Sequence, residues 1–252
     1  NGAQFELGGK GNLTIDCYAS EGIGIGNDYD HGYGDITLGG SGNLEIISNS
    51  VDSVCIGGGF NDDESEINIL SGKLKLSAYC HNGLGTGSFN GDAIVNISDN
   101  ASIEITLSGI SVTGVGSCKG IATITSSADI SVSCTGANSV GIGVLEDGEG
   151  SVYIKKGKVS LKMRSGRHTC IGAIKGSVNT KVKDAEIHID SEGDEMTGIG
   201  DAQGTGNVSV IDSSVNMRVF AGNPTDIGTS GGDLQIQNST INSLINNQPV
   251  AH

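Results

Sequence analysis

Short runs of alternating apolar and polar residues recur along the whole chain. The first run of each repeat lies at residues 13–15, 44–46, 74–76, 103–105, 130–132, 159–161, 187–189 and 215–217. The third run lies at residues 36–38, 67–69, 95–97, 122–124, 152–154, 180–182, 208–210 and 234–236. Between them stands an aliphatic residue followed by glycine, at Ile25-Gly26, Ile56-Gly57, Leu84-Gly85, Val115-Gly116, Ile142-Gly143, Ile171-Gly172, Ile199-Gly200 and Ile227-Gly228. Because side chains alternate between the two faces of a strand, a period of two predicts short strands with one buried face.

The glycine of the second run recurs at steps of 31, 28, 31, 27, 29, 28 and 28 residues. A period of this length is typical of a solenoid, in which each repeat buries its apolar face only against its neighbours. Three strands in each coil of ~28 residues predict an all-β fold, a right-handed parallel β-helix of about eight coils, with the hand taken from the crossover rule for parallel strands. We expect residues 1–252 to form one such domain, a fragment of a longer secreted protein, because the chain opens in mid-repeat at Asn1.

Composition narrows the choice of partners. Glycine makes up 42 of the 252 residues, but only 2 prolines accompany it, and Val and Ile alternate throughout, so the glycines separate strands and do not indicate disorder. The formal net charge of −15 repels phosphate backbones, which excludes nucleic acid as a partner. No window approaches 18 consecutive apolar residues, which excludes a membrane-spanning helix. Such a charge suits a secreted or surface protein, or one that gathers cations.

The cysteines follow the repeat. Cys17 and Cys134 hold the same place in coils four apart, and so do Cys55 and Cys170. At about 4.8 Å per coil these pairs are roughly 19 Å apart, beyond the ~7 Å between Cα atoms that a disulfide spans. We therefore predict no disulfides and assign most thiols to the core as small apolar residues. Free thiols in an exported protein fit an anaerobic source, because they would oxidise elsewhere.

The turn between the second and third runs carries a first candidate site. Stacking would superpose the aromatic and acidic residues of successive turns along one edge. The candidate ligand-binding residues are Tyr29, Tyr33, Phe60, Phe89, Asp62, Asp63 and Asp92. Asp28-x-Asp30-x-Gly32 resembles the opening of a calcium loop, so Asp28, Asp30 and Asp35 are candidate Ca²⁺ ligands. Aromatic faces stack on sugar rings and carboxylates accept from hydroxyls, which indicates a carbohydrate-binding edge; the alternative is a set of soluble turns whose aromatics cover strand ends.

A second candidate site is basic, because 9 of the 14 basic residues fall within residues 155–183. Alternation points Lys162 outward from the first run and Lys181 outward from the third, whereas Arg164 and Arg167 are expected in a turn. These four residues form an alternative site for uronic acids or sulfated glycans, where Lys or Arg could serve as the base of a lyase. The competing interpretation is a solvated face that offsets the acidic coils around it.

Hydrolysis of the polygalacturonase kind needs several aspartates that converge on an exposed sheet. The outward positions of the first and third runs do not carry a dense acidic group. Glu45, Lys75 and Glu104 instead form a ladder of alternating charge. The histidines show no metal-ligand spacing.

With its coils aligned, the chain resembles the right-handed parallel β-helix superfamily, which includes pectate lyases, polygalacturonases, phage tailspikes and bacterial adhesins. The aspartate motifs of the hydrolases and the calcium and arginine signature of the lyases are not found. The segments 22–26 and 56–59 are similar to the Ile-Gly-Gly-Gly repeats of large secreted surface proteins of anaerobic bacteria, some of which are labelled carbohydrate-binding. The resemblance implies a surface location and a glycan or host-matrix ligand.

Three functional hypotheses follow. The leading one is a non-catalytic module, extracellular or on a bacterial cell surface, that binds a polysaccharide or host glycan through the turn edge, assisted by Ca²⁺. The second is a polysaccharide lyase or glycoside hydrolase with its site near Lys162, Arg164 and Arg167. The third is a structural adhesin stalk without a ligand. In each case we expect flanking domains of the same polypeptide.

Overall fold

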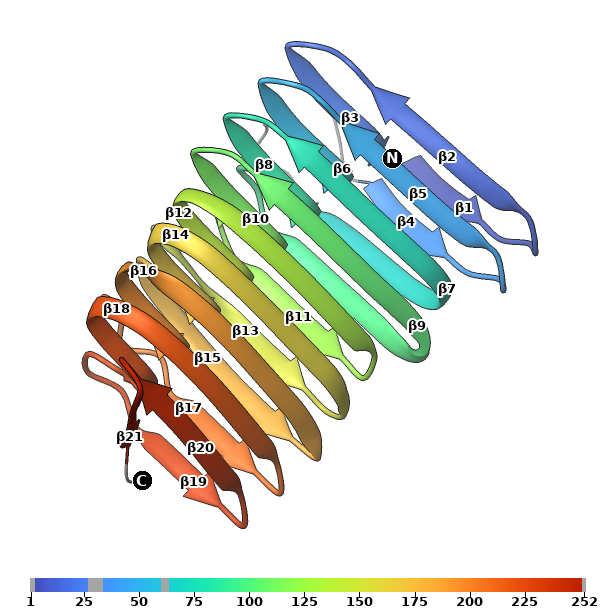
Figure 1. Ribbon diagram of the computed structural model, residues 1–252. Coiled ribbons are helices and arrows are strands. Elements are labelled where there is room, and N and C mark those ends of the chain that lie inside the picture. Colours follow the sequence, from blue (N-terminus) through green and yellow to red (C-terminus); the bar gives the residue numbers. More distant parts are fainter. Residues whose placement is uncertain (1–2, 27–33, 60–63, 251–252) are drawn as a thin grey trace.

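The chain folds as a stack of parallel β coils. The computed structural model describes residues 3–26, 34–59 and 64–250, and within them every regular element is a strand. The coils form a β-solenoid of about eight turns (Figure 1). Each strand pairs in parallel with its counterparts in the neighbouring coils, and only β21 (Gln248–Val250) runs antiparallel, folded back on β20. The prediction of an all-β parallel β-helix is confirmed.

Each coil has three faces, which we name A, B and C after the first, second and third runs. Strands confined to face A are β2 (Asn12–Cys17), β5 (Asn43–Ser48) and β20 (Thr240–Ile245). Strands confined to face B are β3 (Glu21–Gly26), β6 (Asp52–Gly58), β8 (Asn82–Ser88) and β10 (Ser111–Lys119). Strands confined to face C are β1 (Ala3–Leu7), β4 (Gly34–Leu38), β11 (Ala122–Ser126), β13 (Gly148–Ile154), β15 (Gly176–Lys183), β17 (Val208–Ile211) and β19 (Leu234–Gln237).

Six longer strands continue around a corner without a break. Two of them run from face C to face A: β7 (Ser65–Tyr79) and β9 (Ala93–Ser108). Four run from face A to face B: β12 (Asp129–Glu146), β14 (Gly157–Ala173), β16 (Ala185–Asp201) and β18 (Ser214–Thr229). Several segments that read as turns in the sequence are therefore strand.

The strand register confirms the predicted alignment of the first run in every coil. Two alignments of the other runs are wrong by two residues. Gly57 pairs with Gly87, not with Gly85. On face C, Val95 pairs with Ile124, not with Ala122. A shift of two residues keeps every side chain on the same face, so the apolar pattern cannot detect it.

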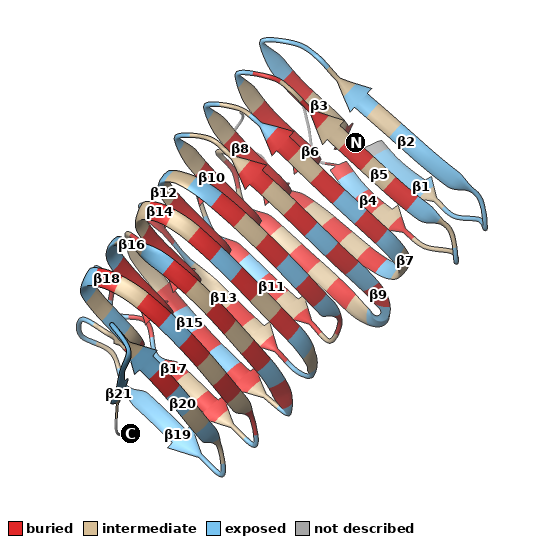
Figure 2. Cartoon of the chain, in the orientation of Figure 1, coloured by how far each residue is buried: buried red, intermediate tan, exposed pale blue. Residues whose placement is uncertain are grey.

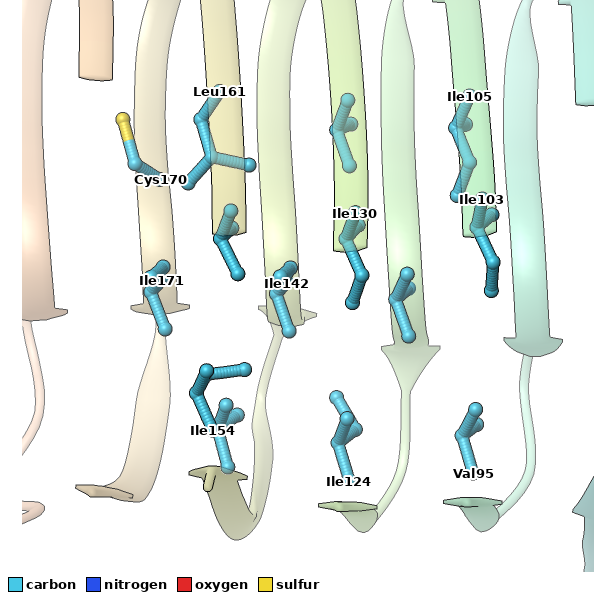
Figure 3. Packing of buried hydrophobic residues seen from close by; sticks show 14 of the residues in the cluster. Val95, Ile103, Ile105, Ile124, Ile130, Ile142, Ile154, Leu161, Cys170 and Ile171 are labelled. Carbon is cyan, nitrogen blue, oxygen red and sulfur yellow. The ribbon is translucent and has the colours of Figure 1, made fainter. Parts of the chain in front are cut away.

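The core is a set of aliphatic columns that run the length of the stack. Buried bands alternate with exposed or half-buried ones along many of the strands in Figure 2, as in β9 and β14. Figure 3 shows Ile142 and Ile171 at the same place in neighbouring coils, and Ile124 beside Ile154 on face C. These side chains are fully buried. At roughly 25 cal/mol for each Å² of apolar surface removed from water, such columns supply the main stabilising term.

A glycine column at the end of face B explains the second run. Gly143 has a φ of +139°, and a Cβ built there would lie 1.8 Å from the carbonyl oxygen of Gly172 in the next coil. Only glycine allows this backbone conformation and this approach. The equivalent residues, each with positive φ, are Gly26, Gly57, Gly87, Gly116, Gly143, Gly172, Gly200 and Gly228.

The outer side of face B is covered. Val54, Leu84 and Val140 point away from the main core, yet they are fully buried in a second apolar cluster. Leu145, near the end of β12, and Ile174, just after β14, complete this cluster. Face B therefore offers no exposed ligand surface over these coils, and exposed columns are to be sought on faces A and C and at the corners.

All six cysteines are free, which confirms the prediction of no disulfides. Cys55, Cys118, Cys134 and Cys170 are buried, and Cys17 and Cys80 are half-buried. Burial raises the pKa of the Cys55, Cys118 and Cys134 thiols to about 12. These thiols therefore stay protonated at neutral pH and behave as small apolar residues.

The glycine column predicts that Gly143→Ala lowers the free energy of unfolding by about 2–4 kcal/mol, because the new methyl group must displace a backbone carbonyl. Chemical denaturation followed by circular dichroism measures the change. Gly8→Ala is the control, because nothing lies within 4 Å of a Cβ at Gly8. An equal loss of unfolding free energy in both variants would contradict the explanation that the close carbonyl oxygen requires glycine in the second run.

Burial of the thiols predicts their reactivity. In the native protein a thiol reagent at pH 8 should modify Cys17 first, and the four buried cysteines should react on the order of a hundredfold more slowly than free cysteine. All six should react at once after unfolding. If Cys17 causes the fast phase of modification, that phase should be missing in Cys17→Ser. Fast native modification of Cys134 or Cys170 would show that the coils open there.

Candidate functional site

A groove of about 580 Å³ lies on the outer side of face A, across β12, β14, β16, β18 and β20. Two outward columns form its walls. One column holds Ser131, Ser160, His188, Asn216 and Asn242. The other holds Ser133, Lys162, Asp190, Arg218 and Leu244. Hydroxyl, amide and charged groups thus repeat at the coil spacing of about 4.8 Å along an open groove, which we name the face A groove.

Asp190 is the electrostatic centre of the face A groove. Its Oδ2 accepts from Nη2 of Arg164 at 2.7 Å, and its Oδ1 accepts from Nη2 of Arg218 at 3.0 Å. Partial burial favours the neutral acid, but the hydrogen bonds and charges of the two arginines outweigh it and hold the pKa of Asp190 below its usual range. Asp190 is therefore a fixed anion that positions two guanidinium groups.

Lys162 differs from the basic residues around it. It stacks directly on Asp190 in the register, yet Asp190 is already occupied by Arg164 and Arg218. Within the described part of the chain, the exposed Lys162 ammonium has no ion-pair or hydrogen-bond partner. The groove therefore contains a cation whose charge the neighbouring coil leaves uncompensated.

His188 stands in the other wall of the groove. Its Nε2 lies 2.5 Å from Oε1 of Glu186, and Nζ of Lys158 lies 3.7 Å from the same oxygen. The hydrogen bond from His188, followed by the charge of Lys158, lowers the pKa of Glu186. Glu186 and Asp190 both remain ionised at neutral pH, so neither can donate a proton as the acid of a hydrolase.

The four residues of the predicted basic site do not lie together. Arg164 and Arg167 lie within β14, not in a turn, and each is paired with an acid one coil on. Nε of Arg167 lies 2.6 Å from Oε2 of Glu195. The interpretation of a basic face that offsets neighbouring acids therefore describes Arg164 and Arg167. Of the four predicted residues, Lys162 is the one without an ion pair or ring contact among the described residues.

Lys181 lies on face C, away from the groove. Its Nζ stands 5.0 Å from the centre of the Tyr153 ring, and Nζ of Lys155 stands 5.4 Å from that centre. Lys181 and Tyr153 pair in the register of neighbouring coils. Their contact is a cation–π interaction, which accounts for the arrangement without a ligand.

Most of the predicted turn edge lies outside the described residues: Asp28, Tyr29, Asp30, Tyr33, Phe60, Asp62 and Asp63. Phe89 is half-buried and packs against the second apolar cluster. Asp92 accepts from the backbone N–H of Ile121 at 2.8 Å. Asp35 is exposed on β4. Among the described residues, no group of three or more His, Cys, Asp or Glu side chains could hold a metal ion.

The sequence reasoning missed Asp190 and Arg218. Both follow first-run triplets by one residue, so the alternation that places His188 outward also places Asp190 outward. Extending each run by one residue would have placed these side chains on the outer side of face A. The pairing of Asp190 with two arginines needs the register and could not be read from one strand.

A buried histidine lies at the corner between faces A and B. Nδ1 of His168 donates to the carbonyl oxygen of Ser165 at 3.0 Å, so Nε2 accepts from the hydroxyl of Ser191. Burial lowers the pKa of His168 to about 4. His168 is thus a neutral structural residue that fixes the strand carrying Arg164 and Arg167, and no substrate reaches it.

No protein-family model, curated protein or solved structure matches the chain. Within the residues that the structure describes, no helix is long and apolar enough to cross a membrane.

His168 predicts a loss of stability in acid. Its pKa is depressed in the folded state, so the unfolded chain binds the proton first as the pH falls from about 6.5 towards 4, and folding loses about 3 kcal/mol over that window. The loss is absent above pH 7. Denaturation midpoints measured from pH 7 to pH 4 test this.

The non-titrating variant His168→Gln separates this group from the carboxylates. It should be less stable than the wild type at pH 7, yet the difference should shrink by about 3 kcal/mol as the pH falls to 4. A constant difference across the range would contradict a neutral buried His168.

Proposed function

We propose that the protein is an extracellular, non-catalytic solenoid that binds an acidic polysaccharide in the face A groove. One observation carries the proposal: Lys162 stands in a long open groove without an ionic partner among the described residues. A carboxylate or sulfate group of a polysaccharide would supply that partner.

The shape of the groove favours a linear polymer of sugars. It crosses five strands, and its walls carry serine hydroxyls and asparagine amides on successive coils. Nδ2 of Asn242 already donates to Oδ1 of Asn216 at 2.9 Å, so these amides form a ladder with further donors and acceptors for hydroxyl groups. The net charge of −15 repels polyanions at long range, so binding must arise from local contacts at Lys162.

A lyase is the second candidate, and the dyad of His188 and Glu186 favours it. In β-elimination a base removes the proton next to a uronate carboxylate, the bond to the neighbouring glycosidic oxygen breaks, and a C=C bond forms while the leaving oxygen takes a proton from water. His188 would accept the proton and Lys162 would neutralise the carboxylate. Binding ranks first because His188 is tied to Glu186 through Nε2.

The predicted calcium site stays a proposal. Asp28 and Asp30, which precede β4 in the sequence, and Asp35 within β4 would hold Ca²⁺, and the carboxylate chemistry supports this. The similarity to Ile-Gly-Gly-Gly surface repeats supports a location outside the cell or on the cell surface. Chelation by EDTA tests the calcium contribution separately from the groove.

We expect Lys162→Ala to be retained less than the wild type in affinity gels that contain polygalacturonate, alginate or chondroitin sulfate. The affinity for the polymer should fall by about fivefold to tenfold, because one charged contact is removed. Lys156→Ala is the matched control, since Lys156 is paired with Asp99 at 2.7 Å outside the groove. Equal retention of both variants would contradict the groove.

The same samples distinguish the alternatives. Growth of ultraviolet absorbance from unsaturated products, lost in His188→Ala, would make the protein a lyase. Loss of retention with EDTA and with Tyr29→Ala, but not with Lys162→Ala, would move the site to the turn edge. No retention on any polymer would leave the structural stalk.

A further inference from the structure

We propose a second glycan site at the corner between faces A and B in the first four coils, where exposed tyrosines are placed to stack on a neutral, β-1,4-linked polysaccharide. We name this surface the tyrosine strip, and it consists of Tyr18, Val51, Tyr79, His81 and Ile110. It shares no residue with the face A groove, so it goes beyond the function proposed above.

The register places the two tyrosines in one column. Cys17 and Ala78 both pair with Ser48, and each is followed by a tyrosine. The hydrogen bond from the Asn49 N–H to the Cys17 carbonyl continues this register to Tyr18. Tyr18 and Tyr79 therefore occupy the same position two coils apart, a spacing of roughly 10 Å.

A second column runs beside the first. The carbonyl oxygen of Val51 accepts from the N–H groups of His81 and Asn82, and the carbonyl of His81 accepts from those of Ile110 and Ser111. Val51, His81 and Ile110 thus repeat on successive coils. The strip is a straight, double row along the solenoid axis.

The large aromatic and aliphatic side chains of the tyrosine strip are exposed to solvent. Tyr18 is 72% exposed, Tyr79 59%, Ile110 53% and Val51 48%. By contrast, Tyr153 is half-buried and held between two lysines. Large aromatic side chains that stay exposed at a sheet corner offer apolar faces to a ligand, and with only two χ angles each they cost little conformational entropy to order.

The chemistry of the strip points to a neutral sugar chain. In the column of the two tyrosines, Asn49 occupies the coil between Tyr18 and Tyr79, and Ser108 occupies the coil after Tyr79. Aromatic faces therefore alternate along the column with side chains that can hydrogen-bond to sugar hydroxyls. The nearby Asp52 carboxylate already accepts from Asn82 Nδ2 at 2.7 Å. Two coils match the length of two sugar units in an extended β-1,4-linked chain, so each tyrosine meets a ring with the same orientation.

The width of the strip favours such a chain over a protein partner. A stable protein interface needs about 800 Å² on each side, with a broad apolar centre. The tyrosine strip is only two side chains wide, and its apolar residues follow one line. A linear ligand covers this line, whereas a globular partner would leave most of its interface on polar surface.

The test uses β-1,4-linked gluco-oligosaccharides of two to six units, with the manno and xylo series in parallel, followed by calorimetry and by tyrosine fluorescence, which is unobscured because the chain has no Trp. We expect one of the six-unit ligands to bind at least about tenfold more tightly than its two-unit counterpart, because only the longer chain reaches both rings. In Tyr18→Ala or Tyr79→Ala this gain from length should disappear.

Three controls sharpen the result. Tyr79→Phe should retain binding, since the ring and not the hydroxyl makes the contact. Tyr153→Ala and Lys162→Ala should bind the neutral ligands as the wild type does. Binding unchanged in both tyrosine-to-alanine variants, or no binding of any neutral series, would overturn the proposal whatever the acidic polymers do.

Discussion

The hydrogen-bonded contact between successive coils is the constraint on which the rest of this structure depends. At the end of face B it brings a carbonyl oxygen to the place where a side chain would begin, as at Gly143 against Gly172. Glycine is therefore required at this place from Gly26 to Gly200, and the residue before it lies in the aliphatic core in these coils except the third, where it is the buried Thr86. Once this corner is fixed, the strand residues of one coil lie about 4.8 Å from their counterparts in the next coil.

This stacking decides what each charged residue does. A basic side chain is neutralised when a neighbouring coil presents an acid, as Arg167 meets Glu195 one coil on and Lys75 meets Glu45 one coil earlier. Lys162 also stacks on an acid, but Asp190 is held by two arginines, which leaves the lysine charge uncompensated. The part of the basic cluster that lies on face A thus separates into arginines paired with acids and Lys162, which has no ion pair among the described residues.

The sequence was sufficient for the fold because its alternation and its glycine spacing report the same repeat. It failed by two residues at Gly87 and at Ile124, where a shift leaves every side chain on its face, and only the positive φ of Gly87 distinguishes it from Gly85. It placed Arg164 in a turn because the residue lies beyond the alternating triplet of its run, whereas β14 continues through it around the corner. The face A groove and the tyrosine strip depend on register between residues about 30 positions apart, which no local pattern contains.

Because coils contact only their neighbours, surfaces on different coils can act independently. Tyr79 and Lys162 are three coils apart, roughly 14 Å along the axis, and both border face A. A polysaccharide lying along this side could contact a neutral segment with its rings and an acidic segment with its charge. Two weak sites joined by one chain reinforce each other through effective concentration, without any further contact. In the proposed arrangement the tyrosines would hold the polymer by stacking, and Lys162 would set where its acidic groups lie on an otherwise strongly acidic protein.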